Sequence, residues 1–429
     1  MGHKAIFASI GYLFFSLILI QNTVELALIS INVPLPVSAL SAIKYAVLAG
    51  MCGFILTTKS TYTLSNTEKL ALALSLVLIL LGAVKGGGSS YIADEFRFYF
   101  APIGLFLLGR TACPFKSEKD MAAFIMTIGI LYVVLGSIYV VIDKQTLVDG
   151  GMRDLLQQKL SDIGRSDAVR NGLPINFYYF HNTGAVSNRA FGALYDPLAS
   201  AFFGAPLFFY LYEAHRRKAA RAAGVLAVAV AVLIVLSFTR SIIAGIVIVL
   251  LASLIHKKGI AALPIWAIFV AALAVGAFLL THLETILDPL DPSTQAHLKA
   301  YLQLDLKSSL IGSLFDSGTP RGAESLYLTI FLECGLGGLL FYLAWISHLY
   351  RNLQRRIAAP YARATLESMF VYLLASFTTE HWFIFTSGSL FWFLIGNTLS
   401  WAEDHEAKTV AEQAQSNAVL FSPPLGASS

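Results

Sequence analysis

The sequence predicts an all-α polytopic membrane protein, and three observations support this fold class. Hydrophobic residues make up 56% of the 429 residues and charged residues only 13%, and the mean hydropathy is +0.69. Apolar runs long enough to cross a bilayer recur along the chain, and lysine and arginine are concentrated in every second short connection. This balance excludes an ordinary soluble domain, whose surface needs more charge.

Apolar segments define the expected helices. The chain is expected to form a single integral membrane domain over residues 1–402, and the polar segment 403–429 a disordered cytoplasmic tail. A span needs roughly 20 apolar residues, or about 17 at the short end, which gives about twelve transmembrane helices. They lie near residues 5–21, 37–56, 69–84, 95–110, 120–142, 192–212, 222–238, 241–256, 260–281, 325–349, 363–380 and 382–401.

Basic residues predict the orientation of these helices. Connections that carry an excess of lysine and arginine stay on the cytoplasmic side, so both termini are expected to be cytoplasmic. The alternate connections carry few cations, and two of them, at about 143–190 and 282–324, are too long to be simple turns. Loops of this length commonly carry function. The basic connections contain Lys59 and Lys69; Arg110, Lys116 and Lys119; Arg216, Arg217, Lys218 and Arg221; Lys257 and Lys258; and Arg351, Arg355, Arg356 and Arg363.

The stretch from Arg321 to Tyr342 is the strongest candidate for a functional element. Arg321 and Glu324 stand one helical turn apart where a polar segment runs into an apolar helix. An ionisable pair is costly near hydrocarbon, which favours a site. Glu324 has two open roles: a general base for deprotonating a substrate, or a helix-capping partner of Arg321.

Two further arginines stand at the predicted outer face. Arg240 interrupts about 35 apolar residues, which as one helix would be on the order of 50 Å long, so we expect two short spans with a recessed arginine between them. An interfacial anchor is the alternative role. Arg189 ends the first long loop in N-R-A-F-G-A-L-Y-D-P, where Asp196-Pro197 is expected to bend the following helix. Its alternatives are a helix-entry residue paired with Asp196 or a bidentate phosphate ligand.

Five weaker candidates complete the predicted substrate site. Arg97 is a possible phosphate contact or part of a solvated loop. Tyr178 belongs to an aromatic run that could stack on sugar rings, with His181 and Asn182 bonding hydroxyls, or could pack on the bundle as a hydrophobic plug. His297 lies on an expected amphipathic surface helix near 294–312, where a structural role is the alternative.

These residues together predict a class of substrate. The outer face offers several arginines and one candidate base at membrane level, while the sequence contains no nucleotide-binding glycine loop and no metal-ligand spacing. Cations at this depth suit a lipid diphosphate, whose tail lies in the bilayer. If a sugar is attached, the arginines can stabilise the leaving group. No cofactor and no nucleic-acid partner are expected.

The same elements resemble the bacterial O-antigen polymerase and ligase superfamily, with its Wzy-type polymerases and WaaL-type ligases. The resemblance covers roughly residues 90–350 and rests on the N-R-A-F-G-A-L-Y-D-P element, a T-R-S turn at 239–241 and E-S-L-Y-L followed by E-C-G-L-G-G-L-L-F. It implies a metal-independent, GT-C-like membrane glycosyltransferase of the bacterial inner membrane, with Arg189 and Arg240 as family arginines. It also implies an undecaprenyl-diphosphate-linked oligosaccharide as substrate, with a chain-length regulator and a flippase of the same pathway as further partners.

Three alternatives stay open. Ligases of this superfamily have a His-Asn pair where this sequence has Glu324-Ser325, which favours a polymerase of exopolysaccharide or O-antigen repeat units over a ligase. A lipid-linked glycan flippase or secondary transporter would use the arginines as counter-charges, but it would be expected to show internal repeats. A non-catalytic partner in an export complex would not need a recessed Arg240.

Overall fold

The protein is described here by a computed structural model that is mostly helical (83%). The large helical share agrees with the all-α class predicted from the apolar segments. The structure describes residues 3–31, 43, 46–48, 50, 64–84, 99, 101–162, 169–170, 173–180, 186–255, 264, 325–377, 379 and 383–420.

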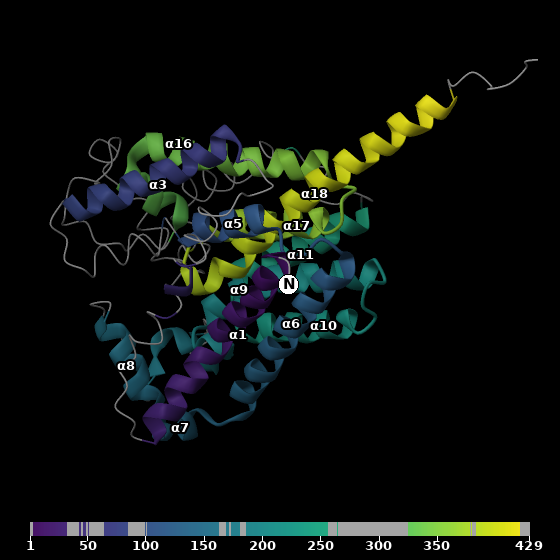
Figure 1. The fold of residues 1–429 in the computed structure, drawn as a ribbon. Helices are drawn as coiled ribbons and strands as arrows, with labels where there is room; N and C mark the ends of the chain where they lie inside the picture. The colour runs from purple at the N-terminus through teal and green to yellow at the C-terminus, as the bar shows by residue number, and fades with distance from the viewer. Residues whose placement is uncertain are drawn as a thin grey trace, which may run out of the picture.

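The described helices pack together in a bundle (Figure 1). The C-terminal half of α18 extends beyond the bundle at one end, while α7 and α8 lie at the other. The helices are α1 (His3–Ser30), α3 (Asn66–Val84), α5 (Ala101–Ala112), α6 (Glu118–Val141), α7 (Lys144–Leu147), α8 (Arg153–Asp162), α9 (Pro197–Arg216), α10 (Ala223–Leu236), α11 (Arg240–Ile255), α16 (Leu326–Arg355), α17 (Ala362–Ala375) and α18 (Phe385–Leu420).

Three of the described helices are long and apolar enough to cross a membrane: Phe7–Ser30, Glu118–Val141 and Leu326–Arg355. Shorter apolar helices are Ala101–Ala112, Ala223–Leu236 and Arg240–Ile255. These apolar helices suggest a membrane protein. Ten of the predicted segments overlap described helices, whereas 37–56 and 260–281 lie largely outside the described residues.

Three predicted boundaries are wrong. Helix α1 continues through residue 30 instead of ending near 21, because the polar side chains that follow are satisfied inside the protein. Helix α9 begins at Pro197, since Asp196 caps it by accepting a hydrogen bond from the Leu198 amide at 3.0 Å; the Asp-Pro pair starts the helix and does not bend it. Helix α18 runs to Leu420, so residues 403–420 are helical where a disordered tail was expected. That segment is rich in alanine and glutamate, which favour helix.

The first long loop contains structure of its own. After α7 come a π-helical turn, η2 (Val148–Met152), and helix α8, then two small antiparallel hairpins. Strand β1 (Val169–Arg170) pairs with β2 (Leu173–Pro174), and β3 (Tyr178–Phe180) pairs with β4 (Val186–Asn188). The second long loop, with the amphipathic helix expected near 294–312, lies outside the described residues.

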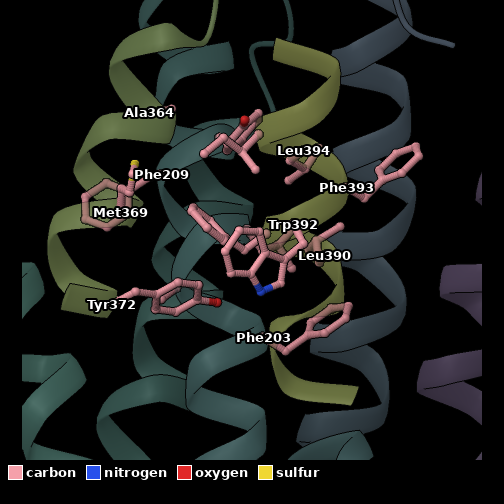
Figure 2. Close-up of a cluster of buried hydrophobic side chains, with 14 of the residues drawn as sticks. Phe203, Phe209, Ala364, Met369, Tyr372, Leu390, Trp392, Phe393 and Leu394 are labelled. Atoms are coloured by element: carbon pink, nitrogen blue, oxygen red, sulfur yellow. The ribbon is translucent and has the colours of Figure 1, made fainter. Parts of the chain in front are cut away.

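The main core lies between α9, α17 and α18 (Figure 2). Aromatic side chains fill it: Trp392 of α18 is fully buried and stacks on Trp345 of α16, with ring centroids 5.1 Å apart and an interplanar angle of 2°. Tyr372 of α17 stacks on Phe202 of α9 at 5.2 Å. Such offset aromatic packing stabilises the contact beyond the burial of apolar area.

Helices α5 and α18 touch through their backbones. A Cβ atom on Gly109 would lie 2.1 Å from the Phe393 carbonyl oxygen, and one on Gly396 would lie 2.1 Å from the Phe106 carbonyl oxygen. Only glycine permits this approach. The contact brings Arg110, 5% exposed, to the acidic Glu403 of α18 and to Ser400.

One end of the bundle is held by ion pairs between the basic connections, and we call it the basic end. It unites loops that the sequence assigns to one side of the membrane. Arg110 also donates from Nε to Glu68 of α3 at 3.0 Å, which joins three elements in one buried cluster. The remaining pairs at this end include Arg217 with Glu118 at 3.1 Å, Lys116 with Asp404 at 2.8 Å, and Arg356 with Glu406 at 2.6 Å.

Candidate functional site: a basic cavity at the opposite end

Arg189 connects the β3–β4 hairpin to the turn between α10 and α11. Its Nε donates to the Ser237 carbonyl at 2.6 Å, Nη1 to the Asn176 carbonyl at 3.1 Å and Nη2 to Thr239 Oγ1 at 3.2 Å. The backbone follows the same path: the Arg189 amide donates to the Phe177 carbonyl at 3.0 Å, and the next amide donates to α10. The arginine is therefore fixed in place by two separate segments, one just before β3 and the other at the turn between α10 and α11.

The guanidinium group still has donors for a ligand. Arginine carries five N–H groups, and the described residues accept from three of them. Two Nη hydrogens therefore stay available to a phosphate, in a planar fork whose orientation is already set. Arg189 combines a structural role with the geometry of an anion ligand.

Arg240 is the first residue of α11, and its side chain is exposed. The break between α10 and α11 falls at Ser237–Thr239, where Phe238 adopts a left-handed φ of 51°. The Arg240 Cζ lies 5.3 Å from the centre of the Tyr179 ring, and that ring stacks on Phe238 at 5.1 Å. A guanidinium stacked on an aromatic face keeps its N–H edges for polar ligands. The two short helices predicted around Arg240 are thus present.

Lys144 is a cation of this site that the sequence analysis did not single out. It opens α7, directly after Asp143, whose carboxylate caps that helix. Its Nζ donates to the Phe177 carbonyl at 2.7 Å and lies 4.3 Å from the centre of the Tyr178 ring. A lysine that follows an apolar helix on the cation-poor side of the chain is the sequence signal that could have identified it.

A cavity of about 310 Å³ lies between these elements. This volume is at the small end of ligand sites, which span about 300–1,000 Å³. Lys144 and Arg189 both line it, and the end of α10 contributes Leu236. The full lining is Tyr139, Val140, Val141, Ile142, Asp143, Lys144, Asn188, Arg189, Ala190 and Leu236. The cavity thus joins apolar side chains from the ends of two helices to two cationic groups.

Charges around the cavity repel one another. Burial lowers the pKa of Arg189, Asp196 raises it, and Arg240 lowers it again. Burial lowers the pKa of Lys144 from its ordinary 10.5 to about 8, and the nearby Arg189 adds to this effect. Arg189 thus interacts with two other cations, Lys144 and Arg240, and with the carboxylate of Asp196. A bound anion would relieve this repulsion.

The lowered pKa of Lys144 predicts how binding depends on pH. Lys144 is cationic below about pH 8 and neutral above it, so anion affinity should fall as the pH rises through about 8. Lys144→Arg should remove this fall, because a guanidinium stays charged. The measurement is diphosphate affinity between about pH 7 and 9.5 in both proteins. An equal dependence of affinity on pH in the two proteins would contradict a role for Lys144.

The free energy of unfolding should change with pH in the opposite direction. It should rise between about pH 8 and 10.5, because over this range Lys144 is protonated in the unfolded chain but neutral in the folded one.

The structure brings together three of the predicted site residues: Arg189, Arg240 and Tyr178. Tyr178 is only 7% exposed, and Lys144 covers one face of its ring, so the packing alternative fits this tyrosine better than an open sugar platform. Tyr179, the next residue, holds the more accessible ring beside Arg240. The other candidates lie outside the described residues: Glu324, Arg321, Arg97, His181, Asn182 and His297.

The stretch predicted as the organising element is described from Ser325 onward. Its start is tied to α17, because Ser325 Oγ and the Leu326 amide both donate to the Ser376 carbonyl at 3.0 Å. Helix α16 then contains a break at Gly335, with φ 69° and ψ −172°. Directly before it, Glu333 accepts a hydrogen bond from the Tyr99 hydroxyl. A carboxylate within an apolar helix therefore exists in this stretch, nine residues beyond the predicted Glu324.

The site as described is a small basic cavity, framed by aromatic rings, at the ends of apolar helices α6, α10 and α11. Its cations come from three different elements, and its geometry is set by backbone carbonyls that accept from Arg189 and Lys144. Such an arrangement can bind an anion whose remainder is apolar. Comparison of the chain with protein-family models, curated proteins and solved structures finds no match.

Proposed function

We propose that the protein is a membrane-embedded glycosyltransferase that polymerises lipid-linked polysaccharide repeat units. It would transfer a glycan from undecaprenyl diphosphate to an acceptor sugar hydroxyl on the periplasmic face of a bacterial inner membrane, without a metal ion. The observation that carries this proposal is the cavity lined by both Lys144 and Arg189, with Arg240 close enough to act on Arg189, at the ends of apolar helices.

The cation arrangement supports a diphosphate as the group bound. A diphosphate leaving group gathers negative charge as its bond to sugar breaks, and preorganised cations stabilise that charge. Arg189 already has its orientation fixed by three acceptors, so binding costs little further ordering. The apolar part of the lining, from Val140 to Ile142 and Leu236, suits the first isoprene units of a lipid carrier.

The chemical step follows from these roles. The acceptor hydroxyl oxygen attacks the anomeric carbon, the bond between that carbon and the phosphate oxygen breaks, and undecaprenyl diphosphate leaves. The hydroxyl proton passes to a carboxylate base, for which Glu324 is the candidate from the sequence. We further propose the complete architecture as about twelve spans with both termini cytoplasmic, which the basic end supports by joining the cation-rich connections.

The test uses purified full-length protein in lipid nanodiscs, a synthetic undecaprenyl-diphosphate oligosaccharide, chelator and no nucleotide. Gel sizing of the product should show a ladder of multiples. Arg240→Ala should lower the transfer rate by about 10²-fold, the loss expected when one charge-stabilising donor is removed. Arg351→Ala, which removes an exposed arginine of α16 at the basic end, should leave the rate unchanged.

Other outcomes would replace the proposal. Transfer to an added acceptor without a ladder would indicate a ligase. Movement of intact lipid-linked glycan across a vesicle membrane, with no new glycosidic bond, would indicate a flippase or transporter. Equal transfer rates in Arg240→Ala and the unmodified protein would remove Arg240 from the reaction.

A further inference from the structure

Helix α1 contains a polar stretch to which the sequence analysis assigned no function: Gln21-Asn22-Thr23-Val24-Glu25. It lies in the candidate membrane span Phe7–Ser30, and two of its side chains are deeply buried, with Gln21 6% and Glu25 3% exposed. Polar groups inside an apolar helix are costly unless they bond to a partner. The identity of that partner points to their role.

Gln21 donates to Glu25 within α1, and the other partners belong to α6 and to the segment 188–197, which contains Arg189 and ends at the start of α9. Asn22 Nδ2 donates to the Ala193 carbonyl at 3.2 Å. Thr23 Oγ1 accepts from the Tyr139 hydroxyl at 2.8 Å, and that hydroxyl lies 2.5 Å from the Tyr195 hydroxyl. Glu25 acts electrostatically on Tyr195. The polar face of α1 is therefore directed at Tyr139 of α6 and at the short segment 188–197.

Tyr195 is held in an unusual conformation at the end of this segment. Its φ is 54°, in the left-handed region that a tyrosine seldom adopts, and its side chain is 3% exposed. Burial and the hydrogen bond with Tyr139 raise the pKa of Tyr195, so the hydroxyl stays protonated and can donate. Asp196, the carboxylate that acts on Arg189, is the next residue.

Tyr139 connects this segment to the cavity. It belongs to α6 and lines the cavity, as do Lys144, Arg189 and Ala190. The hydroxyl contact between Tyr139 and Tyr195 thus joins α6 to the segment that carries Arg189, and Thr23 of α1 supports that contact from behind. These hydroxyl groups therefore link α1 and α6 to the segment that carries Arg189.

We propose that Tyr195, Tyr139 and Thr23 form a positioning unit that holds the segment 188–197 against α6 beside the basic cavity and so sets Arg189 for anion binding. This inference rests on the proposed function, because the anion is taken to be the diphosphate of a lipid carrier. The three residues do not touch the reacting atoms. They act by holding the segment 188–197 against α1 and α6.

The experiment compares Tyr195→Phe and Thr23→Val with two matched controls in the full-length protein. Thr23→Ser keeps the acceptor oxygen and should behave as the unmodified protein. Tyr132→Phe removes another buried hydroxyl of α6, the helix that carries Tyr139. The Tyr132 hydroxyl donates to the Ser200 carbonyl at 2.9 Å, and neither residue lines the cavity. The probe is undecaprenyl diphosphate in nanodiscs, and hydrogen exchange of the backbone amides is measured on the same samples.

Tyr195→Phe and Thr23→Val are expected to weaken undecaprenyl diphosphate binding roughly five- to tenfold, with faster amide exchange over 188–196. The double variant should lose no more than either single one, because both changes remove parts of one unit. The two control variants should bind with unchanged affinity. In the transfer assay the KM for the lipid donor should rise more than kcat falls.

Two results would separate failure of this inference from failure of the proposed function. Unchanged exchange over 188–196 in Tyr195→Phe, or faster exchange with unchanged affinity, would overturn the positioning unit. An unmodified protein that binds no undecaprenyl diphosphate would overturn the proposed function, and the positioning of Arg189 for that anion with it. Equal losses in Tyr132→Phe and Tyr195→Phe would also overturn the inference, because the effect would then be general loss of packing.

Discussion

Replacing Arg189 by alanine is expected to abolish glycan transfer and to lower the free energy of unfolding by about 3 kcal/mol. The substitution leaves the Ser237 and Asn176 carbonyls and the Thr239 hydroxyl without their donor. Each such loss costs about 1–3 kcal/mol when the acceptor is buried, and this site is half-buried, so the lower part of the range applies. The measurement is unfolding by denaturant in mixed micelles, together with the transfer assay.

Arg240→Ala provides the contrast for this prediction. Arg240 is exposed and stacks on Tyr179, so its removal should reduce transfer while the unfolding midpoint stays within experimental error. The free energy of unfolding of Arg189→Lys should lie between those of Arg189→Ala and Arg240→Ala, because a single ammonium cannot donate to all three acceptors as the guanidinium does. If Arg189→Ala were as stable as the unmodified protein, the three bonds would not hold the hairpin to α10, and the structural part of its role would be wrong.

Replacing Gly109 by alanine is expected to destabilise the protein by at least about 4 kcal/mol, an exceptional loss for one methyl group. The new Cβ would lie 2.1 Å from the Phe393 carbonyl oxygen and 2.9 Å from the Asn397 amide nitrogen. Both atoms are backbone, so no side chain can move aside, and α5 must separate from α18. Separation would also pull Arg110 away from Glu403, leaving a buried charge with fewer partners.

The matched control for this prediction is Gly337→Ala in α16, where nothing lies within 4 Å of the added Cβ. That substitution should change stability by less than about 1 kcal/mol, with any change favourable to helix. Thermal unfolding in detergent, followed by near-ultraviolet circular dichroism of the buried tryptophans, distinguishes the two. A Gly109→Ala protein that unfolds at the same temperature as Gly337→Ala would show that the two helices do not meet at this glycine.

Helix positions were largely predictable from the sequence, because length and apolar composition determine where a span can form. The break at Arg240 is the clearest case: the apolar run around it is too long for one helix, and the structure ends α10 and begins α11 there. Helix ends were harder. Gln21 to Glu25 looked like the end of a span, but Thr23 bonds to Tyr139 of α6 and Asn22 bonds to Ala193, 171 residues later in the chain, which no local pattern reveals.

The candidate site was predictable only in part. Arg189 and Arg240 were identifiable because charged residues beside apolar runs are rare and costly. Lys144 was missed because Asp143-Lys144 resembles an ordinary loop start, and its role depends on the Phe177 carbonyl and the Tyr178 ring that tertiary folding brings to it. The roles predicted for Glu324, Arg321 and His297 stay predictions, since these residues lie outside the described part of the chain.

The glycine contact between α5 and α18 constrains the order in which this protein is built. Helix α5 ends at Ala112, whereas α18 begins at Phe385, so the ribosome adds about 270 residues between them. At roughly 5–20 residues per second this interval lasts roughly 15–55 s. During that time Arg110 has Glu68 but not Ser400 or Glu403. The N-terminal spans therefore remain an incomplete assembly until α18 has been synthesised, and a chain that stops before α18 would leave Arg110 without two of its partners.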